Sequence, residues 1–180
     1  MMNLQTERLL LREFVREDVH VLHQYSTHPA LQRFEQGPPV SEFQFHRIVQ
    51  DIIAEQSDEP RRSFYFVVER LADSRVMGSV YIAQRNQDRE QAEIGYMLGV
   101  DFWNEGYATE AADCVIQFGF EVLRLHRIYA EAVCENLASI RVLGKLNMRR
   151  EGVLRENQYF HSRWWDTCMY ALLRHEWADS

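Results

Sequence analysis

The feature that most constrains this chain is a strand that passes through a short turn into a helix, between residues 91 and 123. Over residues 91–100 apolar and polar side chains alternate, which is typical of a strand with one buried face. From Ala108 to Leu123 small and apolar residues recur at helical spacing, and Gly106 opens this helix. Such a junction presents unpaired backbone N–H groups together with the positive end of the helix dipole. It therefore favours binding of a phosphate or pyrophosphate.

The spacing of this junction leaves two interpretations open. A glycine at a strand-to-helix turn is common in ordinary turn chemistry, which needs no ligand. The alternative is an anion site, because Gly106 has no Cβ and Ala108 has only a small side chain. Ligand oxygens can then approach the backbone closely.

The residue types around the junction are more specific than their spacing. The string Trp-Asn-Glu-Gly-Tyr-Ala-Thr-Glu-Ala, residues 103–111, resembles the acyl-coenzyme A pyrophosphate loop of the GNAT N-acetyltransferases. Within that family it is most similar to the ribosomal-protein-alanine N-acetyltransferases, the RimJ and RimL type. The resemblance implies that the chain binds acetyl-CoA through the loop residues Trp103, Asn104, Glu105, Gly106, Tyr107, Ala108 and Thr109.

Two positions of the loop depart from the usual pattern of that branch. Asn104 stands where the branch usually has glycine, and Glu105 stands where it usually has a basic residue. Both residues can still offer backbone N–H groups to a ligand. The carboxylate of Glu105 weakens binding of a pyrophosphate unless it points to solvent.

The bulk composition is that of a globular protein. The chain has 180 residues, 46% of them hydrophobic, and no linker, repeat or low-complexity segment divides it. We therefore expect one domain over residues 1–180. The formal net charge of −7 argues against nonspecific nucleic-acid binding, which needs a basic surface, and suits a cationic acceptor such as an amine.

The cysteines and the hydropathy pattern indicate the compartment. Cys114, Cys134 and Cys168 lie far apart, without metal-ligand spacing, and each is within an apolar pattern. We expect buried free thiols in a reducing compartment and no metal site. No apolar run is typical of a secretion signal or long enough to span a membrane, so the expected location is the cytoplasm.

Hydrophobic periodicity predicts an α+β order of elements. Strands are expected at residues 6–14, 63–69, 76–83, 91–100, 127–135, 149–160 and 164–173, of which the second and third form a hairpin. Helices are expected from about residue 15 to 28, from a capping box at Ser41 to about residue 55, and at 106–123 and 136–146, with Asn147 as a left-handed residue behind the last. This is the element order of the GNAT fold. The resemblance thus implies a mixed sheet of six to seven strands with about four helices.

Moving an acetyl group from a thioester to an amine needs three things. A group must take the proton of the amine, a donor must stabilise the oxyanion, and the departing thiolate needs a proton. In the family, the fourth and fifth strands of the fold separate and expose backbone groups to pantetheine and the acetyl carbonyl. The resemblance assigns such contacts to Leu98, Gly99 and Val100, with the N–H of Leu98 or Val100 as oxyanion donor.

Four side chains are candidates for the other roles. Asn136 is expected to bind pantetheine through its amide, or else to cap a helix. Ser139 looks like the residue that protonates the thiolate, directly or through water, although a first-turn serine is often a cap. Glu93 is the candidate base, acting through water with its pKa raised by apolar neighbours; alternatively it faces solvent or pairs with an arginine. Glu156 is a second candidate base.

The expected function is that of an acetyl-CoA-dependent N-acetyltransferase in which a primary amine attacks the thioester directly. The acceptor stays open between the N-terminal α-amine of a protein and a small-molecule amine. A non-catalytic acyl-CoA-binding or interaction module on the same fold is the alternative.

Overall fold

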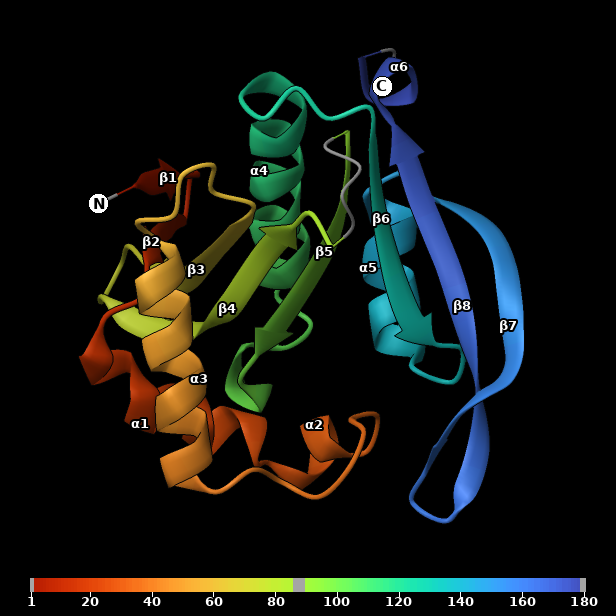
Figure 1. Cartoon of the computed structure of the whole chain (residues 1–180), viewed down its shortest axis with the longest axis horizontal. Helices are drawn as coiled ribbons and strands as arrows, with labels where there is room; N and C mark the ends of the chain where they lie inside the picture. Colours follow the sequence, from red (N-terminus) through yellow and green to blue (C-terminus); the bar gives the residue numbers. More distant parts are fainter. Residues whose placement is uncertain (1, 86–89, 179–180) are drawn as a thin grey trace.

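The computed structural model describes residues 2–85 and 90–178, and its centre is a mixed sheet (Figure 1). In this described part the sheet has eight strands in the order β1-β2-β3-β4-β5-β6-β8-β7. The strands are Asn3–Gln5 (β1), Leu9–Glu13 (β2), Ser63–Arg70 (β3), Arg75–Ala83 (β4), Gln91–Leu98 (β5), Arg127–Val133 (β6), Arg149–Phe160 (β7) and Arg163–Leu173 (β8). All neighbouring strands are antiparallel except β5 and β6, which are parallel.

Helices cover both faces of this sheet. They are Val19–Ser26 (α1), Pro29–Gln32 (α2), Glu42–Glu55 (α3), Tyr107–Glu121 (α4), Leu137–Lys145 (α5) and Arg174–Ala178 (α6), with short 3-10 turns at Arg16–Asp18 and Val100–Phe102. In Figure 1, α3 lies in front of the sheet over β3 and β4, and α4 lies behind it. The larger hydrophobic core is on the α4 side, and a smaller one lies under α1 and α3.

The N-terminus of α4 is positioned by close packing of this helix on the sheet. Phe118 and Phe120 are buried in the larger core. Gly119 lies so close to the strands that an added Cβ would come within 2.7 Å of Ile82 and 2.8 Å of Ile128. The close atoms are the Cδ1 methyl groups of these two buried isoleucines on β4 and β6, so a side chain at this position would have to displace them. Close packing here fixes where the first turn of α4 points.

The element order confirms the expected α+β fold, with a larger number of elements. The described residues form eight strands and six α-helices, not six to seven strands and about four helices. The strand expected at residues 6–14 is β2, Leu9–Glu13, and β1 is an additional strand before it. The two are separated by a turn in which Thr6 donates its N–H to the Leu9 C=O at 2.9 Å. The short helix α2 begins at Pro29, with His28 as its cap, where a helix end was expected. Elements this short have too few residues to show a period.

Several local expectations are confirmed. The Ser41–Gln44 capping box begins α3, β3 and β4 form the hairpin, and Asn147 has a left-handed φ of 57°. The polar connection expected over residues 84–90 lies partly outside the described residues. Within the described ranges, no helix combines the length and apolar character needed to cross a membrane.

Candidate active site

The site begins where β5 and β6 part. Their parallel pairing ends at Glu93 and Tyr129. Beyond that pair the strands separate (Figure 1), while β5 still pairs with β4 as far as Leu98, and β6 with β8 as far as Val133. The two facing edges, which we call the open edges, have no strand partner in the part of the chain that the structure describes. An extended ligand with amide groups can bind such an edge as an added strand does.

The register shows which backbone groups face the open edge of β5. The N–H of Gly99 donates to the C=O of Met77 on β4 at 2.9 Å. Because hydrogen-bonded positions alternate along an antiparallel pair, the N–H and C=O of Leu98 point away from β4, as do those of Tyr96. The Leu98 C=O accepts a hydrogen bond from the indole Nε1 of Trp103 at 2.8 Å. The Leu98 N–H is therefore the group left for a ligand.

The other two residues of this segment differ in what they offer. Gly99 is engaged within the fold, since its C=O accepts the N–H of Phe102 at 3.0 Å and an added Cβ would come within 2.8 Å of the Tyr25 ring. In contrast, the N–H of Val100 has no backbone partner among the described residues. Of the three expected backbone contacts, Leu98 and Val100 thus keep an N–H for a ligand, and the hydrogen bonds of Gly99 hold the turn in place.

The turn before α4 has the backbone conformation that exposes N–H groups. Asn104 has a φ of 63° and Gly106 a φ of 84°, both left-handed. Asparagine tolerates this region better than most residues, which explains why it can replace a glycine here. No side chain caps α4, and the first intrahelical bond runs from Glu110 N–H to Gly106 C=O at 3.0 Å. The N–H groups of residues 107–109 therefore lie at the positive end of the helix dipole without an intrahelical partner.

Arg8 is a residue at this turn that the sequence patterns did not indicate. Its Nη1 donates to the C=O of Glu105 at 3.2 Å, and its guanidinium lies 4.3 Å from the centre of the Tyr107 ring. It also pairs with Glu110 at 2.6 Å. Burial opposes ionisation of Glu110, but hydrogen bonds from Thr6 and Arg8 hold its pKa below the ordinary value. The side chain of Glu105 is exposed, so the carboxylate that departs from the family pattern lies in solvent.

Asn136 and Ser139 lie together at the start of α5. Asn136 Oδ1 accepts the N–H of Ser139 at 3.2 Å, so this amide caps the helix. The hydroxyl of Ser139 lies 3.0 Å from that of Tyr96, which also donates to the Ser139 C=O at 3.3 Å. This contact links β5 to α5 across the open edges. Burial raises the pKa of Tyr96 to about 12, so its phenol stays protonated at neutral pH and can donate.

The surroundings of Glu93 are polar, in contrast to the expected apolar ones. Tyr81 donates to one carboxylate oxygen at 2.7 Å, and Arg85 binds the other at 3.0 Å. The Tyr81 ring lies over Gly95, where an added Cβ would come within 2.4 Å of it. The alternative in which Glu93 pairs with an arginine is therefore the one the structure shows. A proton that binds to Glu93 has to weaken or replace the hydrogen bond from Tyr81 or the ion pair with Arg85.

A second carboxylate lies near Glu93 and was missed in the sequence. Glu131 is on β6, two residues beyond Tyr129, the residue paired with Glu93, and therefore shares its face of the sheet. Partial burial and the charge of Glu93 raise the pKa of Glu131. No hydrogen bond or ion pair of this carboxylate with another described residue occurs. Alternation along β6 is the only sequence signal that could have indicated it.

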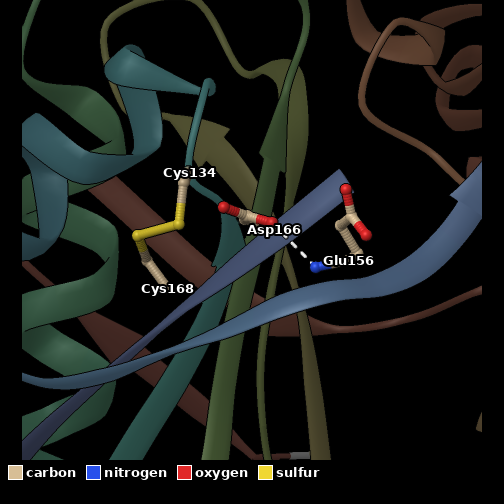
Figure 2. The surroundings of a disulfide bond; sticks show 4 residues. All are labelled: Cys134, Glu156, Asp166 and Cys168. Carbon is tan, nitrogen blue, oxygen red and sulfur yellow. Dashed lines mark hydrogen bonds between the residues drawn. A yellow bond between two sulfur atoms is a disulfide. The ribbon is translucent and has the colours of Figure 1, made fainter. Parts of the chain in front are cut away.

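Glu156, the other candidate base, is exposed on β7. It lies in an irregular stretch between Leu154 and Gln158, with a φ of 47°. Its N–H donates to the carboxylate of Asp166 at 2.7 Å (Figure 2). Strands β6 and β8 lie between β7 and β5 in the sheet. This order separates Glu156 from the open edge of β5.

The expectation of three free cysteines is wrong. Cys134 and Cys168 form a disulfide that joins the end of β6 to β8 (Figure 2). The two residues are far apart in sequence, but antiparallel pairing of β6 with β8 brings their Cα atoms to 5.1 Å. That spacing suits a disulfide. Cys114, on α4, is a free thiol.

Comparison with known proteins identifies the fold and the family. The family model described as "Acetyltransferase (GNAT) domain" matches residues 8–149. The chain belongs to the GNAT acetyltransferase family. It is therefore an N-acetyltransferase by family, and the expected resemblance of the chain to that family is confirmed.

Three relatives show the range of this family. An uncharacterized N-acetyltransferase p20 of Bacillus licheniformis is 34% identical over 178 residues, covering 99% of each chain. A spermidine N(1)-acetyltransferase of Escherichia coli is 27% identical and covers 93% of this chain and 87% of its own length. The crystal structure of a ribosomal-protein-S5-alanine acetyltransferase from Vibrio fischeri has a TM-score of 0.84 at 20% identity, covering 98% and 99%. At that identity the likeness shows the fold alone.

Proposed function

We propose that this GNAT enzyme transfers the acetyl group of acetyl-CoA to a primary amine by direct attack on the thioester. The observation that carries the proposal is that the open edge of β5 ends at Leu98 and leads through one short turn into the uncapped N-terminus of α4 at Tyr107. One region can bind an extended amide-bearing arm, and the other can bind its phosphates. These are the two parts that a coenzyme A site needs.

The residues present fit the coenzyme. Acetyl-CoA supplies an activated acetyl group as a thioester. The N–H groups of residues 107–109 face outward at the positive end of α4, and Arg8 adds a cation beside them. The N–H of Leu98 or Val100 is the donor for the oxyanion at the thioester carbonyl. Trp103 shapes the turn through its bond to Leu98 and does not need to touch the coenzyme with its indole.

Ser139 is the proposed acid for the departing thiolate. Its hydroxyl lies on the first turn of α5, hydrogen-bonded to Tyr96 of β5. When the single phenol proton of Tyr96 is donated to Ser139 Oγ instead of the Ser139 C=O, the serine proton is free to point toward the sulfur. The cap formed by Asn136 keeps the first turn of α5 in position.

The amine acceptor is proposed to bind on the sheet face that carries Glu93 and Glu131. Two carboxylates on one face, in a chain with a net charge of −7, attract a cationic amine. Glu93 takes the proton of the amine through water, since both of its oxygens already accept hydrogen bonds. Glu131 is the second candidate for this role, because its pKa is raised and its carboxylate makes no ion pair with the described residues.

The decisive experiment combines calorimetry with an acceptor panel. Coenzyme A is titrated into the protein, and acetyl-CoA is then incubated with spermidine, amino acids, aminoglycosides and peptides that begin with alanine or serine. We expect coenzyme A binding and one or more acetylated amines detected by mass spectrometry. Binding of the coenzyme without acetylation of any amine, over a pH range of about 6 to 9 that spans the ionisation of typical amines, would contradict the proposal.

A further inference from the structure

Gly95 lies inside β5, where the absence of a side chain has a structural reason. A glycine within a strand weakens it, because it has no side chain to pack and more backbone freedom to lose. The partner of Gly95 on β4 is Tyr81. The three atoms nearest to an added Cβ at Gly95 all belong to this tyrosine: Cε1 at 2.4 Å, Cζ at 2.6 Å and the hydroxyl oxygen at 2.6 Å. The missing side chain therefore makes room for one phenol to lie across β5.

The phenol that crosses β5 ends at Glu93. Partners in an antiparallel pair share a face of the sheet, as do residues two apart on one strand, so Tyr81 and Glu93 are diagonal neighbours on one face. The Tyr81 hydroxyl donates to Glu93 Oε1 at 2.7 Å. Burial and the charge of Glu93 raise the pKa of Tyr81, so the phenol keeps its proton at neutral pH and remains a donor.

The second partner of Glu93 constrains the carboxylate less. Arg85 Nε binds Oε2 at 3.0 Å, but the arginine side chain is 45% exposed. Ion pairs of exposed side chains contribute little, because solvent screens the charges and long side chains lose freedom when they pair. The ring of Tyr81 is partly buried and fits closely against Gly95. Of the two donors, the tyrosine is therefore the rigid one.

Resting on the proposed function, in which Glu93 takes the proton of the amine, we propose that Tyr81 is a positioning residue for this base. Its hydrogen bond holds the carboxylate in one orientation, so that the water between Glu93 and the amine meets an oxygen whose place is fixed. Tyr81 acts through Glu93 and transfers no proton itself. Gly95 is part of the same arrangement, since it gives the phenol its path across β5.

Several titratable or charged groups surround Glu93 and bear on any pH dependence of this arrangement. In order along the chain they are Tyr65 on β3, Tyr81 on β4, Arg85 after β4, and Tyr129 and Glu131 on β6. Among the described residues, only Tyr81 and Arg85 form a hydrogen bond or ion pair with the carboxylate of Glu93. Removal of the Tyr81 hydroxyl therefore deletes one of two identified bonds.

The test compares Tyr81→Phe with Tyr65→Phe. Tyr81→Phe removes the hydroxyl that is bonded to Glu93 and keeps a ring over Gly95. Tyr65→Phe is the matched control, because it removes a phenol hydroxyl from the neighbouring ring, whose centre is 5.4 Å away and whose hydroxyl contacts Arg85 instead of Glu93. We expect kcat/KM for the amine near pH 7 to fall roughly tenfold in Tyr81→Phe alone. The affinity for coenzyme A, measured by calorimetry, should be unchanged in both variants.

The pH profile separates a positioning role from a structural one. The hydrogen bond from the phenol favours the ionised carboxylate over the protonated one. Its loss should therefore move the acid limb of kcat/KM to higher pH in Tyr81→Phe, whereas Tyr65→Phe should keep the limb of the unmodified protein. If the Tyr81 ring served only to cover Gly95, neither variant would move the limb, because phenylalanine covers the glycine as well.

Gly95→Ala provides an independent variant, since its methyl group would occupy the place of the phenol. We expect it to lower kcat/KM about as much as Tyr81→Phe does. In a Tyr81→Ala background, which has no ring at this place, Gly95→Ala should lower kcat/KM little further, because both changes remove the same hydrogen bond. Fully additive losses would contradict the arrangement.

The failure of this inference differs from the failure of the proposed function. If the unmodified protein binds coenzyme A and acetylates amines, but Tyr81→Phe keeps the full rate and the same pH profile, Tyr81 has no positioning role and the enzyme stands. If Glu93→Gln keeps full activity, Glu93 is not the base and the inference falls with that assignment. If the unmodified protein acetylates no amine, the proposed function fails and takes this inference with it.

Discussion

At the scale of single residues, the contact between Ser139 and Tyr96 separates a catalytic role from a capping role. The N–H of Ser139 is bound by Asn136, while its hydroxyl bonds Tyr96 and makes no cap. Ser139→Ala should therefore leave coenzyme A affinity and stability nearly unchanged and lower kcat by roughly tenfold to a thousandfold. Steady-state kinetics with calorimetry and urea denaturation measure all three quantities.

Tyr96→Phe is the matched control for this prediction. It removes only the phenol hydroxyl and leaves the serine in place. We expect a smaller loss of kcat than in Ser139→Ala, because the serine can still donate its proton. If Ser139→Ala keeps full kcat and loses stability, Ser139 serves only to hold α5 against β5.

Glu93 and Glu131 are the two candidates for the base that takes the proton of the amine. Glu93→Gln keeps size and hydrogen bonding but cannot take a proton, so turnover near pH 7 should fall by about a hundredfold if Glu93 is the base. Higher pH should then recover part of the loss, because free amine accumulates. Glu131→Gln should behave in this way instead if Glu131 is the base.

The pH profile adds an independent criterion for Glu131. Partial burial and the charge of Glu93 raise the pKa of Glu131 above the ordinary glutamate value, so activity that depends on its carboxylate should fall at a higher pH than for an ordinary glutamate as the pH drops. If Glu131 is the base, the acid limb of kcat/KM should disappear in Glu131→Gln. In Glu93→Gln it should persist but move to lower pH, because the charge of Glu93 helps to raise the pKa of Glu131. Full activity of both variants across the pH range would exclude both residues as the base.

At the scale of elements, the turn from β5 into α4 combines a left-handed glycine with an uncapped helix end. A branched residue is strained at the φ of 84° that Gly106 adopts. Gly106→Val should therefore disturb the N–H groups that we propose bind the pyrophosphate, and the dissociation constant for coenzyme A should rise at least about tenfold, about 1.4 kcal/mol. Calorimetry measures the change.

Gly106→Asn is the matched variant, since asparagine tolerates the left-handed region. A Cβ at this position would have space, its nearest neighbour being Arg8 Nη2 at 3.6 Å. We expect Gly106→Asn to keep more of the affinity than Gly106→Val. Equal and unchanged affinity in both folded variants would remove this turn from the coenzyme site.

At the scale of the whole molecule, the disulfide joins two strands on the C-terminal side of the sheet. It closes a loop of 34 residues in sequence, so loop-closure entropy predicts a contribution of about 3–4 kcal/mol to the free energy of unfolding. Urea denaturation with and without dithiothreitol should show this difference. Cys114→Ser should show the same difference, and Cys134→Ser should show none.

Much of the architecture could be predicted because its determinants are local. The strand, turn and helix of residues 91–123 follow from periodicity and from one glycine, and the Ser41 capping box follows from residues three apart. The start of α5 at Asn136 is of the same kind. The extra strand β1 and helix α6 escaped prediction because each has few residues and is held by its neighbours in space.

What the sequence determined by itself was the family and the strand–turn–helix junction that we propose binds the coenzyme, since neighbouring residues define both the turn and the helix dipole. Only the tertiary structure decided which distant groups meet there. Arg8 reaches Glu110 across 102 residues, and Cys134 bonds to Cys168 across 34. Arg85 reaches Glu93 from the connection after β4. Such contacts depend on how the strands order and pair in the sheet, and no short-range pattern carries that information.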